Sequence, residues 1–369
     1  MFHEAVMKEV LKLASLGGNL TIPNPMVGAI VLDQNNQIIG RGFHHKFGGA
    51  HAEIEALNDS KQDTNGGSIY VNLEPCCHYG RTPPCVDAII KAGLKRVVIG
   101  ARDSNPKVNG KAIGILQENN IEVIQDVLLE DCIYLNRGFF KYINEDIPWV
   151  TLKLAVTLNG KIADYNGKSR YISGEDALIL THQLRAASSA VMVGAKTYLA
   201  DYSQLNVRLV ACSKQPTRII LDTNLLTLDA LACDNHSGTT ILFYSSNCPK
   251  PLLKLSNVEY IPIQNNSVNN QLNLTQVLQE IKNIELNYLF CEGGGNLASN
   301  LLAQGLIDEI YWIIAPYFLN DNLAINALNA SHKQELANLP KLHKYSTLNL
   351  GQDLLIHGFT GSGLKYLSF

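Results

Sequence analysis

Short apolar runs alternate with amphipathic segments through the first 147 residues, a pattern typical of a layered α/β domain. Phe2 to about Leu16 has apolar residues at helical spacing and predicts a helix. Further helices are expected from near His51, after Pro83-Pro84 to about Gly93, at 113–118 and across 128–142. Short apolar runs predict strands at 28–33, 37–42, 68–73, 96–99 and 121–124.

The chain changes character at Ile147-Pro148, where proline pushes the preceding residue out of the helical region and longer β-rich runs begin. We therefore expect two domains, 1–147 and 148–369. Asn159-Gly160 between apolar runs predicts a hairpin turn, and Ser173 with Asp176 resembles a capping box for a helix reaching about Ala187. Strands are expected at 149–157, 161–163, 190–193, 218–221, 240–244, 288–291, 309–315 and 354–359, and a polar loop at 264–273.

The composition supports two folded domains and excludes several classes of protein. The chain has 369 residues, of which 46% are hydrophobic and only 17% charged, unlike a disordered protein. With 30 Lys and Arg against 33 Asp and Glu, and no dense basic run, we expect no nucleic-acid partner. No apolar stretch is long enough to cross a membrane, and Glu4 and Lys8 interrupt any signal peptide. We therefore expect a cytosolic protein.

Chemistry concentrates in two strings, His51-Ala52-Glu53 and the segment from Glu74 to Cys85, which contains Cys76-Cys77-His78. Of the eight cysteines, this tight cluster suits a metal better than disulfides. One histidine and two thiolates would hold zinc and leave a fourth position for water, which the metal converts to hydroxide near neutral pH.

The local context of these side chains agrees with a zinc-dependent deaminase. Glu53 can face the metal-bound water and transfer protons without ligating the metal. Cys85 begins a helix, whose positive end favours a thiolate, and Cys76 is expected to lie at a helix start likewise. Cys77 and His78 could compete as ligands, although Cys77 is more simply explained by packing and His78 by contact with a substrate. Eight residues separate Cys76 from Cys85, unlike the Pro-Cys-x-x-Cys spacing usual in deaminases.

These motifs resemble a known family almost from end to end: the bifunctional riboflavin-biosynthesis enzymes that join a diaminohydroxyphosphoribosylaminopyrimidine deaminase to a 5-amino-6-(5-phosphoribosylamino)uracil reductase. In the first half the matching segments are 21–28, 49–53, 74–85 and 103–110. The resemblance implies a cytidine-deaminase-like three-layer domain followed by a dihydrofolate-reductase-like α/β domain. It implies that His51, Cys76 and Cys85 bind zinc, that Glu53 shuttles protons, and that the substrate touches Asn24, His78, Arg81 and Asn105. Arg81 also makes physical sense, because a guanidinium can pair with a ribose phosphate.

The second half resembles the reductase domain of the same family, at 153–161, 193–201 and 205–208. Two departures stand out: Asn159 replaces the usual Asp, and Tyr202-Ser203 stand where Asp-Pro is normal. Asn159 either shapes the turn, which we favour, or weakens a substrate contact. The run Glu292-Gly293-Gly294-Gly295 follows a strand and precedes a helix, so its N–H groups can approach the phosphates of a dinucleotide, although it is not a Rossmann fingerprint.

By position, the resemblance assigns two sets of residues to the reductase site. The substrate or catalytic residues are Lys153, Ser169, Arg185, Asp201, Leu205, Arg208 and Glu292. The NADPH contacts are Val156, Tyr171, Thr197, Gly294, Gly295, Asn296, Leu297, Ala298, Ser299 and Asn300. Arg185 and Arg208 would serve as phosphate clamps, although Arg185 on an amphipathic helix could also be an exposed charge.

We therefore expect an enzyme of riboflavin synthesis that deaminates 2,5-diamino-6-(5-phosphoribosylamino)pyrimidin-4(3H)-one with one Zn²⁺ per chain and then reduces the ribosyl group to ribityl with NADPH. The partner is a small molecule rather than a membrane or a nucleic acid, and we expect a homo-oligomer, either a dimer or a tetramer. Two alternatives stay open: a nucleic-acid base deaminase with an accessory domain, and a non-catalytic protein with a structural zinc whose fourth ligand is Cys77 or His78.

Overall fold

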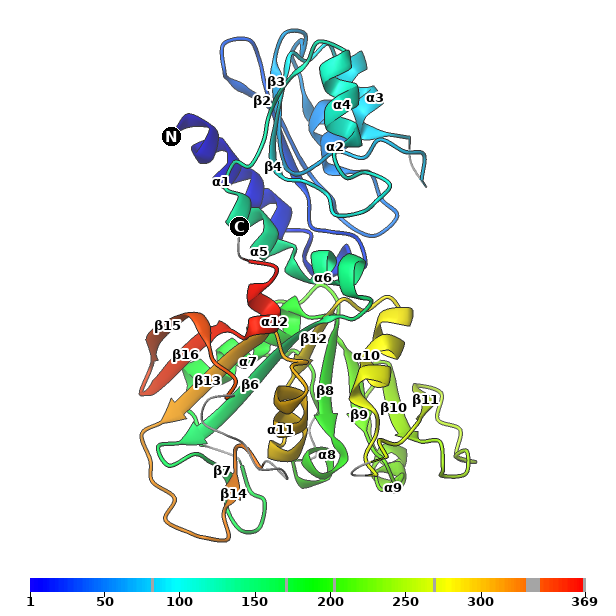
Figure 1. Ribbon diagram of the computed structural model, residues 1–369, viewed down its shortest axis with the longest axis vertical. Coiled ribbons are helices and arrows are strands. Elements are labelled where there is room, and N and C mark those ends of the chain that lie inside the picture. Colours follow the sequence, from blue (N-terminus) through cyan, green and yellow to red (C-terminus); the bar gives the residue numbers. More distant parts are fainter. Residues whose placement is uncertain (81–82, 170–171, 202–203, 268–269, 330–338, 368–369) are drawn as a thin grey trace. The chain divides into compact units, whose positions relative to one another are not determined.

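The computed structural model describes residues 1–369 apart from 81–82, 170–171, 202–203, 268–269, 330–338 and 368–369 (Figure 1). The chain folds into two compact units, Met1–Asp146 together with Tyr366 and Leu367, and Ile147–Lys365. Among the described helices, none combines the length and the apolar character needed to cross a membrane.

The first unit is built on a five-stranded sheet in the order β2-β1-β3-β4-β5. Its strands are β1 (Gly28–Leu32), β2 (Ile38–Phe43), β3 (Ser68–Leu73), β4 (Arg96–Ala101) and β5 (Glu122–Ile124). β1 is antiparallel to β2 and β3, whereas β3, β4 and β5 are parallel to one another. Parallel strands end at the same edge of a sheet, so the loops that follow β3 and β4 lie next to each other.

Helices cover both faces of this sheet, which confirms the predicted three-layer arrangement (Figure 1). α1 (Phe2–Ser15) and α5 (Leu129–Leu135) lie on one face, and α2 (Ala52–Asp59), α3 (Cys85–Lys91) and α4 (Lys111–Glu118) on the other. A short 3₁₀ turn η1 (Gly18–Leu20) and α6 (Arg137–Glu145) complete the unit. Every residue of β1 and β3 is buried, as expected for strands covered on both faces.

A glycine in β2 brings α2 directly onto the sheet. A Cβ at Gly42 would lie 2.5 Å from the carbonyl oxygen of Ala52, at the start of α2. A larger residue would therefore push α2 away from the sheet, together with the residues at its N-terminus. These are the residues that the sequence singles out for chemistry.

The single helix predicted across 128–142 is wrong, because α5 and α6 are separate helices that meet at Asn136. The Asn136 side chain accepts a hydrogen bond from the N–H of Met26 (2.8 Å) and donates one to the Met26 carbonyl (2.9 Å). This contact spans 110 residues of sequence and holds the segment that leads into β1.

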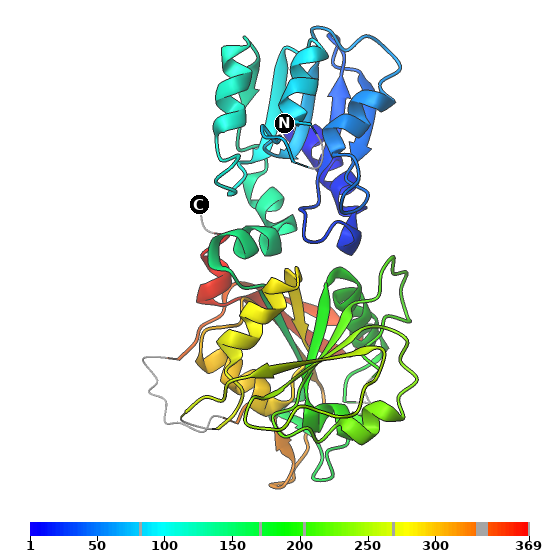
Figure 2. The ribbon, with the colours of Figure 1, turned by 90° about the vertical axis from the view of Figure 1, so that its right-hand side faces the viewer.

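The second unit contains a nine-stranded sheet in the order β11-β10-β9-β8-β12-β6-β13-β16-β15 (Figure 2). The strands are β6 (Trp149–Thr157), β8 (Ala190–Gly194), β9 (Thr217–Leu221), β10 (Thr240–Ser245), β11 (Val258–Ile263), β12 (Tyr288–Cys291), β13 (Glu309–Ala315), β15 (His343–Leu350) and β16 (Asp353–Phe359). All neighbours from β11 to β13 are parallel, and β16 and β15 extend the sheet antiparallel. The helices are α7 (Glu175–Ala187), α8 (Ala195–Asp201), α9 (Leu228–Ala232), α10 (Leu274–Asn283), α11 (Gly295–Ala303) and α12 (Gly361–Leu364).

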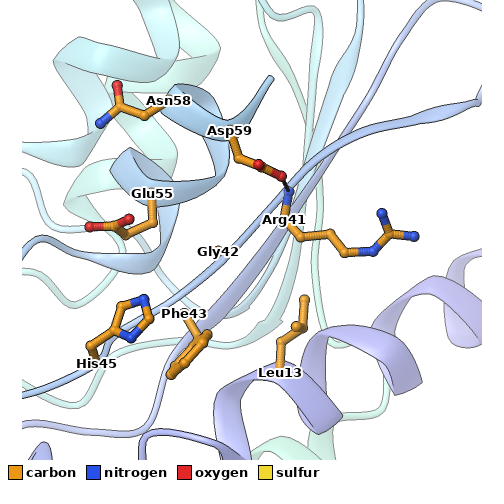
Figure 3. Close-up of a pocket in the computed structure, with 8 residues that line it drawn as sticks. All are labelled: Leu13, Arg41, Gly42, Phe43, His45, Glu55, Asn58 and Asp59. Atoms are coloured by element: carbon orange, nitrogen blue, oxygen red, sulfur yellow. Dashed lines mark hydrogen bonds between the residues drawn. The ribbon is translucent and has the colours of Figure 1, made fainter. Parts of the chain in front are cut away.

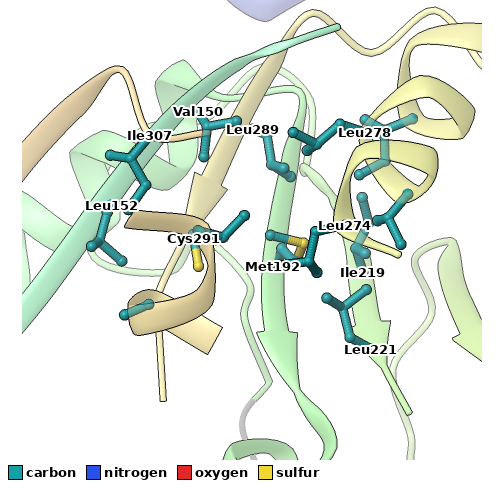
Figure 4. Close-up of a cluster of buried hydrophobic side chains, with 14 of the residues drawn as sticks. Val150, Leu152, Met192, Ile219, Leu221, Leu274, Leu278, Leu289, Cys291 and Ile307 are labelled. Carbon is teal, nitrogen blue, oxygen red and sulfur yellow. The ribbon is translucent and has the colours of Figure 1, made fainter. Parts of the chain in front are cut away.

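The main core of this unit lies between one face of the sheet and helices α10 and α11 (Figure 4). Strand residues such as Val150, Met192 and Ile219 pack there against Leu274 and Leu278 of α10. A second cluster on the opposite face includes Tyr198 of α8 and Leu231 of α9. The sheet is thus covered on both faces, and its strand ends remain available for loops that carry function.

Two local predictions in this unit need correction. Gly160 forms the predicted turn, but β7 (Lys161–Ala163) pairs with β14 (Ile325–Asn326) rather than with β6. The capping box at Ser173 is wrong, because α7 begins after Gly174 and has no side-chain cap of its own. The carboxylate of Asp353 accepts the Gly174 N–H instead, at 2.7 Å.

Asn159 is engaged in the turn that precedes β7. Its amide donates to the carbonyl of Leu319 (3.0 Å) and accepts from the Leu319 N–H (3.2 Å). The Thr157 hydroxyl donates to the Asn159 side-chain oxygen at 2.8 Å. An aspartate could not donate to the Leu319 carbonyl, so asparagine suits this contact.

Candidate active sites

The three predicted metal ligands converge in the first unit. His51 is the N-cap of α2, Cys85 is the first residue of α3, and Cys76 lies in the loop after β3. His51 Nδ1 is 3.2 Å from the Cys85 sulfur and 3.5 Å from the Cys76 sulfur. The prediction that Cys76 begins a helix is wrong. The Cys76 sulfur nevertheless accepts a hydrogen bond from the backbone N–H of Cys85 (3.3 Å), the first residue of α3.

The donor set fits a zinc ion. Tetrahedral zinc at ordinary Zn–S and Zn–N distances separates a sulfur from a nitrogen ligand by about 3.6 Å, close to the separations found here. In the part of the chain that the structure describes, no further histidine, cysteine or carboxylate joins these three side chains as a fourth ligand. Cys77 directs its thiol toward the Lys107 carbonyl, 3.7 Å away. Three ligands with an open fourth position are typical of catalytic rather than structural zinc.

Hydrogen bonding and burial shift the pKa values of Cys76, Cys85 and His51 in different directions. The Cys85 thiol hydrogen-bonds to Cys76 and lowers the pKa of Cys76 to about 4, with His51 adding to the effect. The same hydrogen bond, with burial, raises the pKa of Cys85. The bond to Cys76 raises the pKa of His51.

Glu53 lies on the first turn of α2, with only 3% of its surface exposed. Burial raises its pKa to about 6, and the negative charge of Cys76 adds to this rise. The carboxyl also hydrogen-bonds with Cys85. A carboxyl with this pKa beside the ligands can both accept and donate a proton near neutral pH.

A buried histidine, His44, connects Asn24 to the predicted metal ligands. No feature of the sequence had marked His44 as a functional residue. The Asn24 amide is 3.1 Å from His44 Nε2, and His44 Nδ1 is 2.9 Å from the carbonyl of Ala50. The His44 ring packs edge-on against the His51 ring, with centroids 5.7 Å apart. No local pattern distinguishes His44 from the other histidines of this chain.

The loops after β3 and β4 are joined by Glu74, which the sequence analysis quoted without assigning a role. Its carboxylate accepts the N–H groups of Asp103 (3.3 Å) and Gly110 (3.0 Å). Asp103 in turn accepts the Asn105 N–H at 2.8 Å, and burial raises the pKa of Asp103 to about 6. This network holds Asn105 in the loop beside the cysteine loop. His78 has a buried Nδ1 without a hydrogen-bond partner among the described residues, and Arg81 lies outside them.

A separate cavity of about 430 Å³ is lined by residues of α2, β2 and α1 and by none of the predicted site residues (Figure 3). Its lining is Leu13, Arg41, Gly42, Phe43, His45, Glu55, Asn58 and Asp59. Glu53 and Glu55, two residues apart on a helix, point in different directions. Glu53 is buried beside the ligands, whereas Glu55 faces this cavity.

In the second unit, the glycine run connects β12 to α11 in a backbone shape that other residues rarely adopt. Gly293 and Gly294 have φ of +88° and +33°. A Cβ at Gly294 would lie 2.6 Å from the Thr197 hydroxyl oxygen. The first N–H groups of α11 are therefore not screened by side chains. A cradle of this kind fits a dinucleotide phosphate, and it brings together two of the predicted NADPH contacts, Thr197 and Gly294.

Several predicted NADPH contacts have side chains that point elsewhere. Val156 and Ala298 are buried in the main core, with Leu297 packed against it, and the Ser299 hydroxyl accepts the Asn329 N–H at 2.7 Å. Only the backbone of Val156 and Ala298 remains for a ligand. Gly295, Asn296 and Asn300 lie on α11, where Asn300 donates to the Asn296 carbonyl (2.8 Å), and Tyr171 and Tyr202-Ser203 lie outside the described residues.

The predicted reductase substrate residues centre on a buried ion pair. Arg185 of α7 binds both carboxylate oxygens of Glu292, which follows β12, and donates to the Asn206 carbonyl at 2.8 Å. Their side chains are 9% and 13% exposed, so Arg185 is not a solvated charge. Burial alone would raise the pKa of Glu292, but Arg185 more than offsets it and the pKa is lowered.

Lys153 lies near this pair, and the remaining predicted residues make contacts of their own. Burial lowers the pKa of Lys153, an effect that the charge of Glu292 opposes. The Ser169 hydroxyl donates to Asp201 at 2.9 Å. Leu205 is buried in the second cluster, whereas Arg208 is exposed. His182, which the sequence analysis did not single out, accepts the Arg208 N–H at 3.1 Å.

Comparison with known proteins identifies a family for each unit. Residues 1–101 match the family "Cytidine and deoxycytidylate deaminase zinc-binding region", and residues 148–356 match "RibD C-terminal domain". The riboflavin biosynthesis protein RibD of Aquifex aeolicus is 38% identical over 95% of this chain and 96% of its own length. That of Escherichia coli is 31% identical over 97% and 99%.

Solved structures give the same result for the fold. RibD of Acinetobacter baumannii superposes with a TM-score of 0.84 at 34% identity, covering 97% of this chain and 98% of the other. A Thermotoga maritima protein described as a diaminohydroxyphosphoribosylaminopyrimidine deaminase/5-amino-6-(5-phosphoribosylamino)uracil reductase superposes with a TM-score of 0.82 at 31% identity, covering 97% and 98%. These matches span both units and confirm the expectation drawn from the motifs: the chain belongs to the RibD family of riboflavin biosynthesis proteins.

Proposed function

We propose that this chain catalyses two consecutive steps of riboflavin synthesis. Residues 1–147 would deaminate 2,5-diamino-6-(5-phosphoribosylamino)pyrimidin-4(3H)-one by hydrolysis, and residues 148–369 would reduce the ribosyl side chain of the product to ribityl with NADPH. The observation that carries the proposal is the convergence of His51, Cys76 and Cys85 beside the buried carboxyl of Glu53, in a chain whose second unit has a glycine cradle for a dinucleotide.

In the deaminase, the two thiols and the imidazole would hold zinc. When bound, zinc supplies the Lewis acidity that makes a water molecule nucleophilic at neutral pH. Glu53 takes one proton of the attacking water at a carboxyl oxygen and passes it to the ring nitrogen. It then takes the remaining proton of the added hydroxyl and delivers it to the departing amine. Water is added and ammonia leaves, so Glu53 returns to its starting state after each turnover.

Asn24, His78, Arg81 and Asn105 would bind the substrate of this step. Asn24 is held by His44, and Asn105 by the loop that Glu74 and Asp103 organise. Asn24, His78 and Asn105 come from three separate loops. The pyrimidine ring of the substrate would therefore be bound along its edges, with the ribose phosphate toward Arg81.

In the reductase, Thr197, the glycine turn and the N-terminus of α11 would bind NADPH, with backbone contacts from Val156 and a further contact from Tyr171. NADPH supplies a hydride to C1 of the opened sugar imine. Lys153 and Glu292 lie beside Arg185 in the same buried group and would orient the substrate there. Ser169, Asp201, Leu205 and Arg208 would shape the remainder of the substrate site.

The test uses the full chain and the synthetic pyrimidine. The wild-type protein should contain about one zinc per chain, as expected for a single three-ligand site, and should release ammonia and then oxidise NADPH. Glu53→Gln should abolish ammonia release and retain zinc, while NADPH oxidation with the deaminated substrate continues. Turnover of the pyrimidine by Glu53→Gln would reject the proposed proton transfer. Binding of RNA that weakens with salt would instead favour a nucleic-acid deaminase.

We also propose that the chain forms a homo-oligomer, a dimer or a tetramer, in the cytosol. In the described part of the chain, β15 pairs only with β16 and exposes Tyr345 (65%) and Leu348 (58%). An edge strand with exposed apolar residues readily pairs with a second copy. Tyr345→Lys should shift the mass measured by light scattering toward a smaller species, and an unchanged mass would exclude this edge. All eight cysteines are free thiols, which suits a reducing compartment and can be checked by cell fractionation.

A further inference from the structure

The loop between α8 and β9 carries Arg208, and it is fastened by two side chains of α7 and by Gln215 from the end of the loop itself. Arg185 of α7 donates to the Asn206 carbonyl at 2.8 Å. Gln215 accepts the Val207 N–H (2.7 Å) and donates to the Val207 carbonyl (2.9 Å). His182, one helical turn before Arg185 on α7, accepts the Arg208 N–H at 3.1 Å. The backbone from 206 to 208 is thus held at each successive residue.

His182 is fully buried and makes a hydrogen bond that defines its protonation state. Because Nδ1 accepts a backbone N–H, the ring proton must lie on Nε2 in the neutral form. Nε2 is itself buried and has no partner among the described residues. A protonated, cationic ring could not accept from Arg208, so the contact requires the neutral imidazole.

The surroundings keep the ring neutral. Burial, together with the charges of Arg185 and Arg208, lowers the pKa of His182 to about 4, and the charge of Glu292 acts in the opposite direction. At neutral pH, therefore, His182 is an acceptor at all times.

The side chain of Arg208 reaches solvent. It donates to the Asn206 side-chain oxygen at 3.1 Å, whereas Leu205 and Val207 on either side of Asn206 are buried. The buried residues anchor the loop, and Arg208 presents a cation from it. Arg185, in contrast, already gives three of its N–H donors to Glu292 and Asn206.

We propose that His182 is a positioning residue for substrate phosphate recognition: by holding the Arg208 backbone, it aims the exposed Arg208 guanidinium at the 5-phosphate. This inference rests on the proposed reductase function. His182 does not touch the reacting atoms. Its loss should weaken recognition of the phosphate and leave the hydride-transfer step itself nearly unchanged.

The test compares His182→Leu, which removes the acceptor, with His182→Gln, whose side-chain oxygen can replace it. For the reductase step of the full chain, His182→Leu should raise KM for the phosphorylated substrate about tenfold, as expected for a buried N–H left without a partner, with kcat little changed. Inhibition by ribose 5-phosphate should weaken by a similar factor, whereas inhibition by the dephosphorylated substrate analogue should not change. His182→Gln should restore both values.

Thr181→Val is the matched control. Thr181 is also buried on α7, at 2% exposure, but among the described residues its hydroxyl bonds to the Ala177 carbonyl of its own helix alone. This variant should leave the inhibition by ribose 5-phosphate unchanged. If His182→Leu weakened the phosphorylated and dephosphorylated ligands equally, the residue would be merely structural and the inference would fail.

A measurement on the wild-type chain covers the case in which His182→Leu does not fold. Nitrogen-15 NMR of histidine-labelled protein, assigned with His182→Gln, should show the Nε2-protonated tautomer with a hydrogen-bonded Nδ1. The other tautomer, or a cationic ring at neutral pH, would overturn the inference. Absence of NADPH oxidation by the wild-type chain would instead refute the proposed function, so the two failures are distinguishable.

Discussion

Replacing Arg185 by methionine should destabilise the second unit by about 3–5 kcal/mol, the usual consequence of removing one partner from a buried ion pair. The structure places this pair at 9% and 13% side-chain exposure, with both carboxylate oxygens of Glu292 bound to the guanidinium. In Arg185→Met the carboxylate stays buried without its cation, and the Asn206 carbonyl also loses a donor. The loss therefore belongs at the upper part of this range.

Urea unfolding followed by tryptophan fluorescence measures this effect. The chain has two tryptophans, Trp149 and Trp312, and both lie in the second unit, so the signal reports that unit. The double variant Arg185→Met with Glu292→Met should regain most of the lost stability, because a buried pair replaced by apolar residues of similar size is often neutral. If the double variant is no more stable than Arg185→Met alone, the unpaired carboxylate is not the cause and the reasoning is refuted.

Three further predictions concern the metal, the cofactor and pH. Cys76→Ser should lose zinc in elemental analysis and Cys77→Ser should retain it; loss of zinc from both would make Cys77 a ligand. Gly294→Ala, whose Cβ would lie 2.6 Å from the Thr197 hydroxyl at a φ of +33°, should weaken NADPH binding at least tenfold by fluorescence titration, and unchanged binding would exclude the cradle. Because the pKa of His182 is about 4 instead of 6.5, the free energy of unfolding of the wild-type chain should decrease as pH falls through that interval. Urea unfolding at pH 7 and pH 5 should show a smaller decrease for His182→Gln.

Local sequence signals were sufficient for most of the fold and for the metal ligands. Mostly apolar runs such as 149–157 lie on strands with the predicted bounds, since strands buried on both faces are largely apolar. The proposed ligand His51 and the proposed proton carrier Glu53 lie at a helix start, as the sequence predicted, because the beginning of a helix follows recognisable signals. Cys85 could be placed at a helix start for a similar reason, because Pro83-Pro84 before it mark the beginning of a helix.

Features that depend on distant contacts could not be found this way. Asn136 ends a helix because it binds Met26, which lies 110 residues away in sequence. The cap of α7 comes from Asp353, 179 residues after Gly174. β15 was not predicted because it lies at the edge of the sheet and six of its eight residues are exposed, so no apolar pattern marks it. His182 was missed for the same reason as Asn136: its partner is a backbone N–H 26 positions along the chain.

The Arg185–Glu292 pair has a consequence for the order of events in the second unit. Glu292 immediately precedes the glycine turn, and Arg185 also grips Asn206 of the loop that carries Arg208. The Arg185 guanidinium therefore bridges the segment assigned to the cofactor and the segment assigned to the sugar phosphate. Any ligand that stiffens one segment makes the other easier to order, and such an effect is reciprocal by thermodynamic necessity. Cofactor and sugar phosphate should each bind more tightly to a chain already holding the other.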